Sequence, residues 1–511
     1  MIRFWSVESD PAAQGRIAGA KPVAVLDIGS NSVRLVVYER LARALTVLYN
    51  EKSASGLGRG VAATGKLSDD SMARALKAIR RFAMVCKLTE VGDIHAIATS
   101  ATREAENGPD FVRSVEEVIG VPVRVLSGAE EAHYAALGLV AGMPAFDGVI
   151  GDLGGGSLEL AAVSGREDHM GETHELGAIR LQDDSDMTPE RAVEIARERL
   201  TRSKVLKSGR HTSFGAVGGT WRALARLHQA RTKYPLHMVQ DYTVPSKDML
   251  ELCDLLTKDD KKPVAGMDIV SRARKGLLPY GAAVLAEVLR AGEFEEVVFS
   301  ALGVREGYLF DQLDPDEKAA DPLLQATAEI SSLRSRAPEF ASDLIEGSKA
   351  FFDMIGIEET ADEKRLRIAS CYISDIGWRA HPDYRGEQSV DMVAFSDIVG
   401  IGHPGRAFLA QTLAYRYMGL KQKSASARLL ALAGDSLNAR ARLLGAFFRV
   451  AYPLTAAMPG ILPQTSFGVQ GDALVLHLPG DLAFLDGERL YGRHKQLAQE
   501  AGFKAAEIKV G

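Results

Sequence analysis

Two segments of the chain carry the same spacing of residues that could hold phosphate groups and a cation. In each segment an aspartate, Asp27 or Asp152, is followed by a turn of small residues, a serine five positions on and a leucine eight positions on. Successive backbone N–H groups and serine hydroxyls in such a turn form a concave site for phosphate. An aspartate beside bound phosphate requires a cation between them, and carboxylate oxygens suit Mg²⁺. One such turn is equally consistent with an ordinary hairpin loop, but two matched copies favour the phosphate site.

Each of these turns lies between two apolar runs, which the pattern predicts to be paired β-strands. Residues 23–26 and 35–38 flank the first turn, and residues 149–150 and 160–163 flank the second. The sequence therefore predicts two β-hairpins with the same tip chemistry, one in each of two similar domains. The predicted phosphate contacts at the two tips are Ser30, Asn31, Ser32, Gly154, Gly155, Gly156 and Ser157.

Other predicted strands also run into small polar turns, most of which open helices. Polar turns at the carboxyl ends of strands that alternate with helices are what an α/β phosphate site requires. The predicted strands cover residues 91–99, 122–126, 214–217 and 297–300, and the helices that open at these turns cover residues 132–140, 221–228 and 304–313.

The composition is that of a soluble globular protein with several domains. The 511 residues are 46% hydrophobic and 25% charged, and the net charge of −6 argues against a surface devoted to nucleic acid. Cys86, Cys253 and Cys371 lack the spacing of a zinc site or a disulfide framework, so we expect them to be buried reduced thiols. The sequence shows neither a signal-peptide pattern nor an apolar run of the ~20 residues that a membrane span needs. We therefore expect a cytoplasmic protein that binds neither membrane nor nucleic acid.

The domain boundaries follow from changes in the pattern. From residue 323 onward the periodicity is helical, until a short strand predicted over residues 473–477, and an acidic segment over residues 314–317 marks the boundary. We expect residues 1–20 to be a disordered tail. Residues 21–145 and 146–314 are expected to be the two α/β domains, and residues 315–511 a mostly helical domain.

Taken together, these motifs resemble those of the exopolyphosphatase and guanosine pentaphosphate phosphatase family (Ppx/GppA), within the actin, sugar kinase and Hsp70 superfamily. The resemblance implies an α/β fold in which two ribonuclease-H-like domains face each other across a cleft. It further implies a C-terminal helical domain similar to HD-type phosphohydrolases, and a homodimer. The motifs that carry it are residues 27–32, 98–103, 127–132, 152–159, 218–220 and 300–307.

The resemblance implies two catalytic residues. Glu131 matches the family's catalytic glutamate, which orients and deprotonates water. Glu130 and Glu131 together also fit the simpler role of acids that favour the start of a helix. Arg103 matches an arginine beside the cleft, where a guanidinium can bind phosphate through two N–H groups.

The remaining implied contacts concern metal and substrate. The implied cofactor is Mg²⁺, and its implied ligands are Asp152, Glu159 and Asp27. Three residues of the superfamily's nucleotide-contacting turn, predicted here to contact substrate, are Gly218, Gly219 and Thr220. Arg305 and Glu306 match the family's closing segment and are predicted to hold that turn and helix in place.

The helical domain departs from the HD pattern. The position of the metal-binding His-Asp pair reads Ser374-Asp375, and His381 and His403 nearby are expected to be structural, so we expect no second hydrolase. A basic stretch in the same domain is typical either of a track for a long polyanion or of a solvated helix face. Its residues are Lys421, Lys423, Arg428, Arg440, Arg442 and Arg449, opposed only by Asp435.

The resulting hypothesis is stepwise hydrolysis of the terminal phosphate of linear inorganic polyphosphate, with release of orthophosphate. The nearest alternative is removal of the 5′ γ-phosphate of guanosine pentaphosphate (pppGpp), and the basic stretch favours polyphosphate. A sugar or acetate-type kinase of the same fold would need an adenosine pocket and a catalytic aspartate in place of Glu130-Glu131. A non-catalytic sensor of polyphosphate or alarmone would have no need of Glu131, Asp152 and both hairpins.

Overall fold

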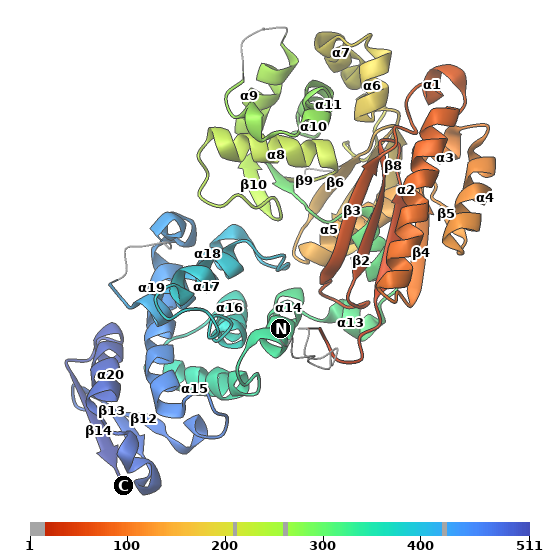
Figure 1. Cartoon of the computed structure of the whole chain (residues 1–511). Coiled ribbons are helices and arrows are strands. Elements are labelled where there is room, and N and C mark those ends of the chain that lie inside the picture. Colours follow the sequence, from red (N-terminus) through yellow and green to blue (C-terminus); the bar gives the residue numbers. More distant parts are fainter. Residues whose placement is uncertain (1–15, 208–211, 259–263, 422–426) are drawn as a thin grey trace, which may run out of the picture. The chain divides into compact units, whose positions relative to one another are not determined.

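The computed structural model of the chain describes residues 16–207, 212–258, 264–421 and 427–511. Two compact units follow one another along the chain, Ile17–Ala320 and Asp321–Gly511 (Figure 1). The division falls six residues after the predicted boundary at residue 314. Most of the tail predicted over residues 1–20 lies outside the described residues.

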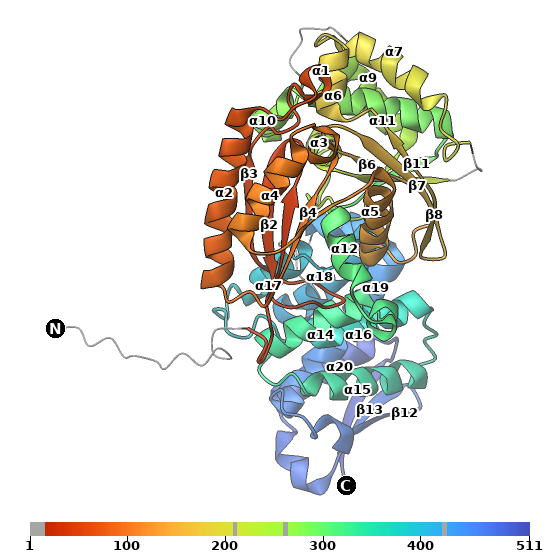
Figure 2. The same cartoon turned by 90° about the vertical axis from the view of Figure 1, so that its right-hand side faces the viewer.

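The first unit contains two sheets, and the N-terminal sheet has the strand order β3-β2-β1-β4-β5. Strands β1 and β2 form the first predicted hairpin, β3 extends it in antiparallel fashion, and β4 and β5 add to β1 in parallel. Helices α2 (Asp69–Leu88) and α4 (Gly108–Ile119) cover one face with Phe82 and Phe111, which are fully buried (Figure 2). The strands are β1 (Val23–Ile28), β2 (Ser32–Tyr38), β3 (Val47–Ala54), β4 (Asp93–Ala98) and β5 (Val123–Val125).

The second sheet repeats this arrangement in the order β10-β11-β9-β6-β7-β8. Strands β6, β7 and β8 form an antiparallel meander, and β9 adds to β6 in parallel, as β4 adds to β1. This repetition confirms the expected two-lobed α/β fold. The strands are β6 (Gly148–Leu153), β7 (Leu158–Ser164), β8 (Glu167–His174), β9 (Ser213–Val217), β10 (Tyr242–Pro245) and β11 (Glu296–Phe299).

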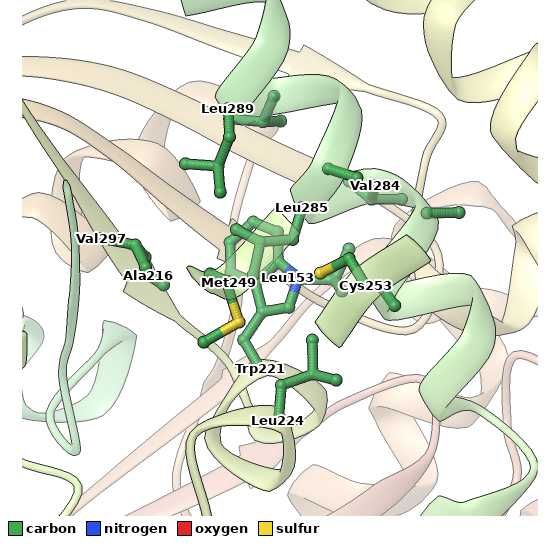
Figure 3. Packing of buried hydrophobic residues seen from close by; sticks show 14 of the residues in the cluster. Leu153, Ala216, Trp221, Leu224, Met249, Cys253, Val284, Leu285, Leu289 and Val297 are labelled. Carbon is green, nitrogen blue, oxygen red and sulfur yellow. The ribbon is translucent and has the colours of Figure 1, made fainter. Parts of the chain in front are cut away.

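The core of the second lobe forms around Trp221, at the start of helix α8 (Gly219–Arg231). Figure 3 shows its indole ring among Met249, Cys253 and Leu285, which come from α8's neighbours α9 (Ser246–Thr257) and α11 (Leu278–Gly292). The buried indole Nε1 donates a hydrogen bond to Gly281 O at 2.9 Å, so that no polar group is left unsatisfied. This packing fixes the Gly218–Thr220 turn, which immediately precedes the tryptophan.

Helices α5 (Gly128–Gly142) and α12 (Val304–Asp311) pack closely against each other. A Cβ atom on Gly307 would lie 2.6 Å from Gly138 N, so only glycine permits this approach. Glu130 and Glu131 lie in the first turn of α5, and Arg305 and Glu306 lie in the first turn of α12. The close contact therefore fixes the charged first turns of both helices relative to the strands.

The second unit is mostly helical, as expected, and ends in a small sheet of order β12-β13-β14. Phe351, Phe447 and Phe467 pack against one another in tilted and edge-on arrangements, with ring centroids 5.1–6.0 Å apart. Its helices are α14 (Pro322–Arg334), α15 (Phe340–Met354), α16 (Ala361–Ile373), α17 (Arg385–Ala394), α18 (His403–Met418), α19 (Ala427–Thr455) and α20 (Glu488–Glu500). Its strands are β12 (Ser466–Gln470), β13 (Ala473–Leu478) and β14 (Ala505–Val510).

Cys86, Cys253 and Cys371 are buried free thiols, as predicted. Within the described ranges, none of the helices combines the length and the apolar character that crossing a bilayer demands.

Candidate active site

A single cleft in the first unit gathers almost all of the residues that the sequence singled out. Both hairpin tips, the start of α5, the Gly218–Thr220 turn and the start of α12 line it. Of the predicted site residues, only Gly156 and Arg103 are outside its lining. Those that line it are Asp27, Ser30, Asn31, Ser32, Glu131, Asp152, Gly154, Gly155, Ser157, Glu159, Gly218, Gly219 and Thr220.

The two hairpin tips touch each other across the cleft. A Cβ atom on Gly155 would lie 2.9 Å from the Cβ of Ser30, and one on Gly156 would lie 2.8 Å from Ser100 Oγ. Ser30 Oγ and Ser100 Oγ are themselves 3.0 Å apart and hydrogen-bonded. The glycines of the second tip are therefore needed for the close approach of the lobes. This approach places hydroxyl and N–H donors from both lobes beside the same space.

The structure separates the roles of the two adjacent glutamates that begin helix α5. Glu130 caps the helix, because its carboxylate accepts hydrogen bonds from Ser127 N and Ser127 Oγ, each at 2.8 Å, and pairs with Arg124 Nη2 at 2.6 Å. The Ser127 N–H, then Arg124 and the Ser127 hydroxyl, lower the pKa of Glu130 to about 2. Its neighbour Glu131 is 6% exposed and turns into the cleft. The helix start thus uses one acid for capping and leaves the other for chemistry.

Glu131 is held by Arg103 at the edge of the cleft. Arg103 Nη1 donates to Glu131 Oε1 and, at 2.6 Å, to Leu126 O, which fixes the guanidinium against the start of α5. Burial raises the pKa of Glu131 to about 7 despite Arg103, and the nearby carboxylates of Asp152 and Asp27 add to the rise. A carboxylate with its pKa near neutrality is suited to accept a proton from water.

Two further carboxylates lie opposite each other close to the turn of the second hairpin. Asp152 on β6 is paired in register with Glu159 on β7. Burial, followed by the repulsion of Asp27, raises the pKa of Asp152 to about 6 although Arg222 opposes the rise. Burial and the charge of Glu131 raise the pKa of Glu159. Its Oε1 atom is buried without a hydrogen-bond partner.

This arrangement fits a divalent cation that is completed by its substrate. Buried carboxylates that repel one another, one with an unsatisfied oxygen, are stabilised by a cation. In the described ranges, His, Cys, Asp and Glu side chains nowhere converge in threes as a ready-made metal cage. Mg²⁺ typically binds one or two carboxylates and completes its shell with water and phosphate oxygens. Asp152 and Glu159 are such a pair.

Asp27, the first hairpin's counterpart of Asp152, is engaged differently. Its Oδ2 forms an ion pair with Arg305 Nη1 at 2.8 Å. Glu306, next to that arginine, accepts from Gly303 N at 2.9 Å and from Tyr38 Oη at 2.8 Å, which ties α12 to β2. These contacts agree with the predicted positioning role of Arg305 and Glu306.

Four basic residues that the sequence analysis did not single out also line this cleft: Arg34, Lys52, Arg222 and Arg274. Arg222 Nη1 donates to Ala301 O at 2.6 Å, and Arg274 Nη1 donates to Thr220 Oγ1 at 3.1 Å. Partial burial, followed by the charges of Arg274 and Arg34, lowers the pKa of Lys52 to about 8. Such a concentration of positive charge attracts a substrate with several phosphate groups. Arg34 could have been found from its place in the hairpin repeat, whereas Arg274 follows no motif.

The second unit does not present an open metal site at Ser374-Asp375. Asp375 is buried between Arg336 and Arg416, with N–O distances of 3.0 and 2.8 Å. The guanidinium of Arg416 lies over the ring of Tyr452, 3.5 Å from its centroid. Two guanidinium groups thus balance the carboxylate where an HD domain would hold metal.

The basic stretch of the second unit is largely paired with acids. Lys423 lies outside the described residues, and Arg449 donates to Arg416 O. The other three arginines form ion pairs, which are Arg428–Asp391 (2.8 Å), Arg440–Glu363 (2.8 Å) and Arg442–Glu500 (2.6 Å). These ion pairs favour the interpretation of the stretch as a solvated helix face over its interpretation as an open track for a polyanion.

The fold and the cleft define a two-lobed phosphoryl-transfer enzyme. Comparison with known proteins gives its family: residues 36–315, more than half of the chain, match the model of the Ppx/GppA phosphatase family, to which the chain belongs. Residues 323–508 match the model described as exopolyphosphatase, C-terminal. The expectation of a phosphatase of this family is thereby confirmed.

Curated relatives and solved structures agree with this assignment. Exopolyphosphatase 2 of Mycobacterium tuberculosis is 30% identical over 292 residues, 52% of this chain and 90% of that protein. Exopolyphosphatase 1 of Mycobacterium bovis is 27% identical over 323 residues, 61% of this chain and 93% of that protein. The fold resembles that of an exopolyphosphatase-like protein (TM-score 0.51, 23% identity), which covers 57% of this chain and 98% of that one. It also resembles an exopolyphosphatase from Cytophaga hutchinsonii (TM-score 0.50, 24% identity; 57% and 97% coverage).

Proposed function

We propose that this protein is an exopolyphosphatase, which hydrolyses the terminal phosphate of linear inorganic polyphosphate and releases orthophosphate. The observation that carries the proposal is the position of Glu131. Its buried carboxylate faces a cleft whose walls carry phosphate-binding tips from both lobes and four further cations. The mycobacterial relatives described above are exopolyphosphatases, which supports the same substrate.

In this proposal Glu131 is the general base. It accepts a proton from a water molecule whose oxygen attacks the terminal phosphorus, while the bond from that phosphorus to the bridging oxygen breaks and the shortened chain leaves with the bond's electrons. Arg103 holds the Glu131 carboxylate in place through the contact described above. A positioned base of this kind contributes about 10²–10⁴-fold to the rate.

We assign Asp152 and Glu159 as the principal ligands of Mg²⁺, with Asp27 in a lesser part because Arg305 already neutralises it. When bound, the ion neutralises charge on the terminal phosphate oxygens. Ser30, Asn31, Ser32 and the Gly154–Ser157 turn donate to the terminal phosphates. Arg34, Lys52 and Arg274 lie where further phosphates of a chain would extend toward Gly218–Thr220.

Hydrolysis of pppGpp is the alternative within the same family. The concentration of cations beside the Gly218–Thr220 turn favours polyphosphate, since Arg274 Nη1 would lie only 2.7 Å from a Cβ on Gly219 and covers that turn. We further propose, from the family resemblance, a cytoplasmic homodimer.

The test is orthophosphate release with Mg²⁺ from long-chain polyphosphate and from pppGpp. Wild type, Glu131→Gln and the matched control Glu130→Gln are compared, because the two acids are adjacent and only one turns into the cleft. We expect rapid release from polyphosphate, a loss of 10²-fold or more in Glu131→Gln, and near wild-type activity in Glu130→Gln. Preference for pppGpp would replace the substrate but keep the base. Release that survives in Glu131→Gln would refute the mechanism.

A further inference from the structure

The small sheet of the second unit leaves one edge without a partner strand. Strand β14 (Ala505–Val510) is at the end of the order β12-β13-β14 and, among the described residues, pairs only with β13, in parallel. Ala505 donates its N–H toward β13, to Asp472 O at 3.2 Å. Because successive residues of a strand alternate, the N–H and C=O groups of residues 506, 508 and 510 face the outer edge. Such an edge is a template for another strand.

The residue types along β14 are symmetric about Ile508. Glu507 and Lys509 flank it with opposite charges, and Ala506 and Val510 flank these with apolar side chains. Two copies of β14 that pair in antiparallel fashion about a two-fold axis at Ile508 therefore place Glu507 of each copy opposite Lys509 of the other. The outward-facing groups of Ile508 then form a hydrogen-bonded pair with their symmetry mates.

The charges also select this register over its neighbours. The two neighbouring registers that keep these hydrogen bonds place the two-fold axis at residue 507 or at residue 509. The first puts Glu507 of one copy opposite Glu507 of the other, and the second does the same for Lys509. Like charges directly opposite each other destabilise a strand pair, whereas opposite charges stabilise it. In the two-fold register the Glu507–Lys509 pairs occupy non-hydrogen-bonded positions, where the Cα atoms approach to about 4.5 Å. Within one strand Glu507 Oε2 and Lys509 Nζ lie 3.6 Å apart, and with 49% and 44% of their areas exposed both side chains can also reach a second strand. Lys509 Nζ additionally donates to Gln470 Oε1 on β12.

Exposed apolar side chains occur on β14 and on the elements that contact it. Phe484, in the short helix η4 (Gly480–Leu485), is fully exposed, and η4 contacts β14. Val510 is 46% exposed at the end of β14, and Tyr491 is 45% exposed at the start of α20. A specific interface buries about 800 Å² per partner, which is more than one short strand pair covers. Aromatic side chains such as Phe484 are the usual anchors for the remaining area.

We propose that two copies of this chain associate through the outer edge of β14, so that two three-stranded sheets join into one across a two-fold axis. Phe484 packs against the second copy beside this shared edge. The proposal gives the homodimer a specific interface, and it makes no use of the substrate or of the active-site chemistry. Its failure is therefore distinguishable from failure of the proposed function.

Charge reversal on the full chain tests this interface by sedimentation velocity over about 1–50 μM, where the monomer has a mass of 55.0 kDa. We expect wild type to sediment as a dimer. Glu507→Lys and Lys509→Glu each place like charges opposite each other twice, and each should raise the dissociation constant roughly tenfold or more. The double variant E507K/K509E restores opposite charges and should restore the dimer. Phe484→Ser should also weaken it.

The control is Leu88→Ser, which changes a 75% exposed apolar side chain on α2 in the first unit and should leave the dimer intact. Far-UV circular dichroism and thermal unfolding verify that each variant is folded. A monomeric wild type over the whole range would overturn the proposal. Dimers that survive both single reversals would overturn it as well, and so would a double variant that remains monomeric while folded.

Discussion

The two hairpins of the first unit share a backbone and a spacing, but they place opposite charges across from their aspartates. On the first hairpin Asp27 is in register with Arg34, and on the second Asp152 is in register with Glu159. Asp27 is additionally paired with Arg305. One repeat therefore supplies a charge-balanced arm beside phosphate, and the other supplies excess negative charge that a cation must balance.

This difference shows how a duplicated phosphate-binding hairpin can become two unlike halves of one site. In the proposed function, the residue seven positions after each aspartate decides which hairpin binds the cation and which contacts phosphate. The cleft shows the same division. The carboxylates with raised pKa values lie near the second hairpin. The cationic residues Arg34 and Lys52 lie on the first hairpin's strand β2 and on the neighbouring strand β3.

The largest expected effect comes from removing the carboxylate that distinguishes the second hairpin. Glu159→Gln should lower kcat for orthophosphate release about 10²–10³-fold at saturating Mg²⁺, because the proposed carboxylate ligand that positions the cation against the reacting phosphate is lost. The corresponding change in the first hairpin, Arg34→Gln, should mainly raise KM, by roughly tenfold, because it removes a contact to phosphate that persists throughout the reaction. Equal effects on kcat in the two variants would contradict the division of roles.

A second prediction concerns the pH dependence of the base. Because the pKa of Glu131 is about 7, kcat should fall on the acidic side as the carboxylate becomes protonated. Arg103 lowers this pKa through its hydrogen bond and charge, so Arg103→Gln should move the acidic limb to higher pH by roughly one unit. Rate profiles from pH 5 to 9 measure the shift. If the acidic limb of the Arg103→Gln profile stays in place or moves to lower pH, the titration of Glu131 is not its cause.

A third prediction concerns stability without divalent cation. Asp152, Glu131 and Glu159 have folded-state pKa values above those of unfolded chains, so the folded state binds protons more tightly. For Asp152 and Glu131 this stabilisation should be fully present below about pH 4 and be lost as the pH rises through about 6 for Asp152 and about 7 for Glu131. Glu131→Gln should recover on the order of 2 kcal/mol at pH 8 and little at pH 4. Thermal unfolding with a chelator at both pH values measures the difference, and an equal gain at both would argue against buried charge as its cause.

The smallest expected effect belongs to the acid next to the base. Glu130→Gln weakens the capping box at the start of α5 and should cost about 1 kcal/mol of stability. Orthophosphate release should be unchanged within a factor of about two at a temperature where the variant is folded. A loss of activity comparable to that of Glu131→Gln would mean that the two acids act together.

Much of the fold could be predicted from sequence because its signals are local. The hairpins around Asp27 and Asp152, and strands β4, β9 and β11, follow from apolar runs that end in small polar turns. The choice between Glu130 and Glu131 also had a local signal, since Ser127 and Glu130 have the spacing of a capping box. The opposite charges of Arg34 and Glu159, each seven residues after an aspartate, could likewise be seen by aligning the two repeats.

Other features depend on residues that are far apart in the chain. Arg274 reaches Thr220 from 54 positions away, and Arg442 pairs with Glu500 from 58 positions away. No periodicity or motif connects such pairs, since tertiary packing alone brings them together. For the same reason the sequence could not show that Arg305 neutralises Asp27, or that arginines surround Asp375 in the second unit.

Mg²⁺ titrations of Asp27→Asn and Asp152→Asn test whether the aspartates of the two hairpins have taken different roles. Orthophosphate release from polyphosphate is measured as a function of free Mg²⁺ for both variants and wild type. We expect Asp152→Asn to need at least tenfold more Mg²⁺ and to lose most of its kcat, since it removes a principal ligand. Asp27→Asn should keep the wild-type Mg²⁺ requirement, with a lower melting temperature because Arg305 loses its partner. An equal shift of the Mg²⁺ requirement in the two variants would contradict the account and make the hairpins equivalent metal-binding arms.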